Sequence, residues 1–171
     1  MYVLGHIGIS LLLFAPIAAA LLAAGHVGIA VLTGALMVVF GPLPDLDEYT
    51  DRIDHRGPTH TVWFAGVVGL GVGLGAFGIA TVSTSLGVDV AAATGFDPHS
   101  IGIWFGAIST LTILGHLAGD LITPMGVWPF RPVSDWHHTF DLTPAKNPQA
   151  NQLCFGAGVI ALSSALVLVF V

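Results

Sequence analysis

Long apolar runs alternate with short polar stretches along this chain, and a run of roughly 17–25 apolar residues is long enough to cross a hydrocarbon core about 30 Å thick. Five runs meet or approach this length, although the second is short. They are Val3–Ala24, Val27–Leu43, Thr61–Val82, Ile101–Thr123 and Leu153–Val171. The pattern predicts an all-α fold, an integral membrane bundle of about five transmembrane helices.

The connections between the runs differ in length. Ala24, Gly25 and His26 fit a tight turn, whereas Ser83–Ser100 and Pro124–Gln152 are longer links. We find no internal repeat in the sequence. With 171 residues in total, the chain is expected to form a single domain over residues 1–171.

The composition agrees with this fold. Hydrophobic residues make up 54% of the chain and charged residues only 8%, which is typical of membrane proteins. Ten acidic residues outnumber four basic ones, so the basic surface of a nucleic-acid-binding protein is missing. We therefore expect a multi-pass cell-membrane protein in contact with lipid, with no nucleic-acid partner.

Glycines recur at a spacing of four within two of the runs. Small residues at this spacing let two membrane helices approach closely. A nucleotide-binding loop is the other reading, but no strand precedes the glycines and no lysine lies among them. Packing within one chain and homo-oligomer formation both remain open for these pairs, Gly69/Gly73, Gly71/Gly75 and Gly102/Gly106.

One apolar run carries an ionisable pair near its end. His116 and Asp120 are four residues apart, which places them on one face of a helix about one turn from each other. Ionisable groups at membrane depth are costly and are usually compensated. A shared divalent cation would compensate them, and further candidate ligands lie in another segment of the chain.

The basic residues predict which end of the bundle is cytoplasmic. All four fall in the second and fourth connections, namely Arg52, Arg56, Arg131 and Lys146. By the positive-inside rule this side and the N-terminus are cytoplasmic. Six of the eight histidines are expected at the same end.

Histidine nitrogens and carboxylate oxygens gathered at one membrane face predict a metal site. Zinc is the expected ion, with manganese as an alternative, and one to three ions could bind. A bound ion can activate water and clamp a phosphoryl group, so the pattern favours a hydrolase. The predicted ligands are His6, Asp45, His60, His116 and Asp120.

Three neighbouring residues are assigned catalytic or supporting roles. Asp47 could act as a general base or could orient a ligand histidine, and a solvated loop acid is the alternative. Arg56 could clamp a phosphate or carboxylate, or could simply set the topology. His55 could be a ligand or an orienting group, and His60 is the preferred ligand because it opens the third helix.

The motifs together resemble the membrane-bound metal-dependent hydrolases of the YdjM type, which are also described as LexA-binding inner-membrane proteins. The matching elements are His6, PDLD at 44–47, HRGPTH at 55–60, GHLAGDLITP at 115–124, Gly126 and WPF at 128–130. They span most of the chain in one order. The resemblance implies a metal-dependent hydrolase in the membrane.

A more distant similarity is to the all-helical zinc-dependent phospholipase C and nuclease group. The order His, Asp, His, His-x-x-x-Asp is similar to the ligand order of that group, which cleaves phosphodiesters. On this similarity His137 and Asp141 form a second pair, where the group has His-x-x-x-Glu. Asp141 is shorter in reach, and no match for the group's remaining His or its N-terminal amine ligand is evident, so two ions are favoured over three. The roles of His137, His138 and Asp141 stay open.

Two classes of function are weighed. The first is a hydrolase that cleaves a phosphoester of a lipid or lipid-like substrate from the cytoplasmic leaflet. The second is a metal-binding, metal-transporting or regulatory membrane protein without catalysis. Transport would predict ionisable residues near the bilayer midplane. The middle of each apolar run is nearly free of them, which favours the enzyme.

Overall fold

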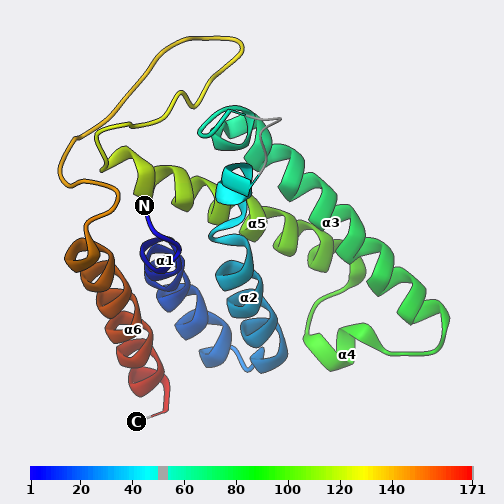
Figure 1. The fold of residues 1–171 in the computed structure, drawn as a ribbon. Coiled ribbons are helices and arrows are strands. Elements are labelled where there is room, and N and C mark those ends of the chain that lie inside the picture. Colours follow the sequence, from blue (N-terminus) through cyan, green and yellow to red (C-terminus); the bar gives the residue numbers. More distant parts are fainter. Residues whose placement is uncertain (50–53, 171) are drawn as a thin grey trace.

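The computed structural model describes residues 1–49 and 54–170 of the chain, and it confirms the all-α prediction (Figure 1). Within these residues five helical segments are long and apolar enough to span a membrane. Their helices are α1 (Val3–Ala23), α2 (Val27–Phe40), α3 (Val62–Ser85), α5 (Pro98–Leu121) and α6 (Pro148–Phe170). Arg52, one of the basic residues used to predict orientation, lies outside the described residues.

Three short helices complete the described fold. The second span continues from α2 into the 3-10 helix η1 (Leu43–Tyr49), where Pro42 and Pro44 prevent a regular α-helix. A second 3-10 turn, η2 (Pro58–His60), leads into α3. The sequence did not predict α4 (Val90–Thr94), which lies within the third connection.

Two spans begin earlier than predicted because their caps lie outside the apolar runs. Asp97 accepts hydrogen bonds from the backbone N–H groups of His99 and Ser100, and Pro98 occupies the first helical position of α5. Asn147 likewise accepts a hydrogen bond from the backbone N–H of Gln149 at the start of α6. The apolar runs therefore predicted starts for α5 and α6 that are a few residues too late.

Helices α1, α2 and α3 pack on α5, which carries the largest set of buried residues among the described helices, and α6 packs on α1. Figure 1 shows α6, α1 and α2 in a row, with α3 lying along α5. The amino-terminal end of α1, the helix η1 and the carboxyl-terminal end of α5 meet at one end of the bundle. The α1–α2 turn and α4 lie at the opposite end.

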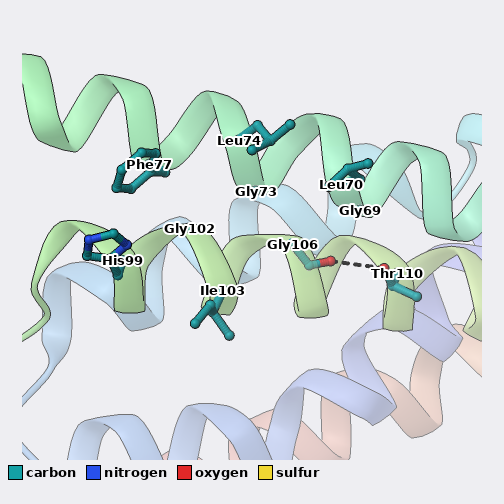
Figure 2. Close-up of a pocket in the computed structure, with 10 residues that line it drawn as sticks. All are labelled: Gly69, Leu70, Gly73, Leu74, Phe77, His99, Gly102, Ile103, Gly106 and Thr110. Carbon is teal, nitrogen blue, oxygen red and sulfur yellow. Dashed lines mark hydrogen bonds between the residues drawn. The ribbon is translucent and has the colours of Figure 1, made fainter.

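The glycine pairs separate into two groups in the structure. A Cβ on Gly73 would lie 2.8 Å from the carbonyl oxygen of Gly102, and one on Gly106 would lie 3.0 Å from that of Gly69. Figure 2 shows these four glycines between α3 and α5. A Cβ on Gly71 would meet nothing within 4 Å. The glycines between α3 and α5 therefore pack within the chain. Homo-oligomer formation through Gly71 and Gly75 stays a prediction.

This difference gives a matched pair of substitutions. We expect Gly73→Ala to lower the free energy of unfolding by about 1–3 kcal/mol, because the added methyl group would overlap the backbone of α5. Gly71→Ala should leave stability unchanged or raise it slightly, since alanine favours a helix and nothing opposes the methyl group. Unfolding in mixed detergent micelles measures both, and equal effects would contradict the packing described here.

Candidate metal centre

Four buried side chains from three elements gather where α1, η1 and α5 meet. His6 lies in the first turns of α1, Asp45 in η1, and His116 and Asp120 in the last two turns of α5. One ligand atom from each lies within 4.8 Å of the others. This group, called the metal centre below, could hold a metal ion.

His60 adds a fifth donor, although it lies just outside that group of four. Its Nε2 lies 3.2 Å from His116 Nε2, 3.4 Å from Asp45 Oδ1 and 3.3 Å from Asp120 Oδ2. His116 Nε2 lies 3.4 Å from each of the same two oxygens. Four ligands about 2.0–2.2 Å from a tetrahedral ion are separated by about 3.3–3.6 Å. The measured separations therefore fit a small four-coordinate cation.

His6 faces the other oxygen of each carboxylate. Its Nε2 lies 3.5 Å from Asp45 Oδ2 and 3.6 Å from Asp120 Oδ1. The ring stacks on His116 with 3.6 Å between centroids. Neither ring nitrogen of His6 has a hydrogen-bond partner among the described residues, although the side chain is buried. Buried polar atoms normally have partners, so these nitrogens fit a ligand role.

Hydrogen bonds fix the direction in which His116 presents its lone pair. His116 Nδ1 lies 2.8 Å from the carbonyl oxygen of Gly41, which can only accept a hydrogen bond. The proton is therefore on Nδ1, and Nε2 points its lone pair into the metal centre. This arrangement of a ligand histidine against a carbonyl is common in metal proteins.

Asp47 orients His60 in the way that the Gly41 carbonyl orients His116. Its Oδ2 lies 3.3 Å from His60 Nδ1 and accepts a hydrogen bond of 2.7 Å from the Thr59 hydroxyl. Its Oδ1 lies 2.8 Å from His55 Nδ1. The Asp47 side chain is fully buried, so it is not a solvated loop acid. Both oxygens are engaged, an arrangement that suits an orienting group better than a free general base.

We expect Asp47→Asn to weaken metal binding about 10–100-fold, because an amide cannot hold His60 as a carboxylate does. The matched control is Asp54→Asn, which changes an exposed acid in the same connection. Competition with a chromogenic chelator measures the affinity of each variant. An unchanged metal affinity in Asp47→Asn would show that His60 binds metal without the Asp47 carboxylate.

Arg56 points into the protein rather than to its surface. Its backbone adopts a left-handed φ of 57°, which few residues other than glycine tolerate. The guanidinium donates to Asp120 Oδ1 at 2.8 Å and to Thr123 Oγ1 and the Gly126 carbonyl at 2.9 Å each. Its geometry is that of a buried counter-ion to Asp120, whose Oδ1 also lies 2.7 Å from the Met1 amino group.

The environment of His60 also shifts its titration. Burial disfavours the charged form, but hydrogen bonds to Asp120 and Asp45 favour it more strongly, so the pKa of His60 lies above its ordinary value. A proton on His60 therefore competes with a cation for the same nitrogen.

The structure does not bring the second predicted ligand pair into the metal centre. His137 Nε2 lies 2.8 Å from the carbonyl oxygen of Met125, and Asp141 is exposed with a φ of 47°. His138 stacks on Trp136. His55 lies beside the centre, one-third exposed, between Asp47 and Glu48.

Sequence reasoning missed three groups that support the metal centre. The carbonyl oxygens of Gly41 and Gly126 carry no sequence signal, because every residue has one. Asn151 is buried at the start of α6 and accepts a hydrogen bond of 2.9 Å from the backbone N–H of Tyr2. This bond ties α6 to the turn that carries His6. It is one of four amide residues before the last apolar run, so the sequence did not single it out.

Comparisons with known proteins identify the family. No curated protein and no solved structure matches the chain, so the distant similarity to zinc-dependent phospholipase C is not shown. One family model, described as the YdjM inner membrane protein, matches residues 1–171, the whole chain. This match and the five apolar spans make the chain a multi-pass membrane protein. We conclude that it belongs to the YdjM inner membrane protein family.

Proposed function

We propose that this protein is an integral-membrane metal-dependent hydrolase that cleaves a phosphoester of a lipid or lipid-like substrate. The observation that carries the proposal is a buried set of nitrogen and carboxylate donors at one end of a membrane bundle. His60 and His116 lie 3.2 Å apart, and each lies 3.3–3.4 Å from oxygens of Asp45 and Asp120. Nitrogen and oxygen donors at these separations favour zinc, with manganese as the alternative.

The residues of the site have different proposed roles. His60 and His116 present fixed lone pairs, and each carboxylate offers one oxygen toward them and one toward His6. These residues would hold a divalent ion between them. A bound divalent ion would supply Lewis acidity toward a phosphoryl group and water. His55, held by Asp47 and partly exposed, is placed to exchange protons with solvent.

The cytoplasmic side is proposed for the metal centre. Arg131 and Lys146 are exposed in the connection that follows α5, at the end where the centre lies. Positive charge in short connections marks the cytoplasmic side. Arg56 does not add to this argument because it is buried against Asp120.

The test is metal content followed by hydrolysis. Purified protein should retain or take up at least one equivalent of zinc or manganese, measured by mass spectrometry. It should then hydrolyse bis(p-nitrophenyl) phosphate or p-nitrophenyl phosphate in detergent, with loss of activity on chelation. Bound metal without hydrolysis of any phosphoester would favour the metal-binding, transporting or regulatory alternative. A protein that binds no ion would refute both the metal centre and the enzyme.

A further inference from the structure

A cavity of about 480 Å³ lies between the first turn of α1 and the corner where α2 meets η1, and Asp45 forms part of its wall. Asp45 belongs both to the cavity wall and to the metal centre. Its side chain is 11% exposed, whereas those of His6, His60, His116 and Asp120 are fully buried. Asp45 is thus the most exposed of the five donors and the one that lines the cavity.

The walls of this cavity differ in polarity along its length. Val3 at the start of α1 and Val39 near the end of α2 form an apolar side and are largely exposed. Both residues belong to helices that are long and apolar enough to span a membrane, so we expect their exposed faces to contact lipid. Glu48 and Tyr49, both in η1, form a more polar side of the cavity. The cavity therefore has an apolar side on two candidate membrane spans and one residue of the metal centre, Asp45, in its wall.

Two other apolar cavities in the described part of the chain lack a residue of the metal centre. The groove between α3 and α5 is lined by glycines and apolar side chains, and its wall contains no residue of the metal centre (Figure 2). The cavity beside Trp63 and Arg131 contains none either. Neither would bring a bound molecule to the ligand atoms.

We propose that the cavity between α1 and η1 admits an amphiphilic phosphoester laterally from the bilayer, with its alkyl chain along Val39 and Val3 and its phosphoryl group beside Asp45. This inference rests on the proposed hydrolase and names its substrate class as a membrane-resident amphiphile. Lipid tails are as apolar as the cavity wall, so the cavity positions the chain without a large gain in affinity. Positioning remote parts of a substrate contributes to the reaction rate.

The test uses two tryptophan substitutions on the same helix. Val39→Trp would fill the cavity, whereas Val31→Trp changes a residue of α2 with nearly the same exposure, 64% against 65%, that does not line it. We expect Val39→Trp to lower the ratio of long-chain to water-soluble phosphodiester hydrolysis on the order of tenfold or more. Both variants should keep the metal content of the wild type, and Val31→Trp should keep the ratio. An unchanged ratio in Val39→Trp would overturn the inference.

A second measurement is independent of hydrolysis. A hexadecyl phosphate with a diazirine in its chain is photolysed with metal-loaded protein, and labelled residues are mapped by mass spectrometry. Labelling that centres on Val39 and Leu46, is competed by dodecyl phosphate and is lost in Val39→Trp would support the inference. Labelling confined to the groove between α3 and α5 would refute it, even if phosphoesters are hydrolysed. Cavity labelling in a protein without phosphoesterase activity would refute the hydrolase and leave an amphiphile-binding site.

Discussion

Replacing Asp120 with asparagine should weaken metal binding more than about a hundredfold, because residues that only support a ligand already cost about 10–100-fold. Asp120 contributes one oxygen toward His60 and His116 and the other toward His6. An amide keeps the shape of the side chain but loses the negative charge that both sides of the centre share. Mass spectrometry of metal content and chelator competition measure the loss.

Asp141→Asn is the informative control for this substitution. The similarity to phospholipase C nominates Asp141 as a ligand, whereas the structure places it exposed and away from the metal centre. We expect this variant to bind metal as the wild type does. Circular dichroism of both variants separates loss of a ligand from unfolding. A larger loss in Asp141→Asn than in Asp120→Asn would mean that the connection after α5 closes onto the centre.

Replacing Arg56 with alanine should lower the free energy of unfolding of the metal-free protein by about 3–5 kcal/mol. The guanidinium is the 2.8 Å partner of the fully buried Asp120, and its removal leaves that carboxylate without this counter-ion. Arg131→Ala is the matched control, since the ion pair between Arg131 and Asp135 is exposed and should contribute less than about 1 kcal/mol. Unfolding in mixed micelles compares the two variants.

A double substitution tests the stated cause. If Asp120 is the reason for the loss, Arg56→Ala combined with Asp120→Asn should be less destabilised than the sum of the single substitutions. Additive effects would show that Arg56 stabilises the protein mainly through Thr123 and the Gly126 carbonyl. Addition of zinc should partly restore stability to Arg56→Ala alone, because a cation can replace the lost positive charge.

Each proposed role depends on a different feature of the same end of the bundle. The donors bind, Asp47 and Gly41 orient two of them, Arg56 balances charge, and the cavity at Asp45 gives access. These features come from segments far apart in the chain. Loss of metal binding, loss of stability and loss of chain-length selectivity can therefore be measured separately.

The sequence by itself determined the membrane-spanning segments and part of the metal centre. Bilayer thickness fixes the length of an apolar helix, so the five spans could be read directly, although capping by Asp97 and Asn147 shifted two of their starts. The helical period fixed His116 and Asp120 on one face. Topology then predicted that His6, Asp45 and His60 would meet them, and the structure brings them together.

Only the tertiary structure decided how the remaining residues are used. It turned Arg56 inward, placed His137 and Asp141 outside the centre, and separated the packed Gly73 from the open Gly71. It also supplied the Gly41 carbonyl and the cavity beside Asp45. The physical reason is that local spacing fixes side-chain direction only within one helix, whereas loops and helix faces take their orientation from contacts with segments distant in sequence.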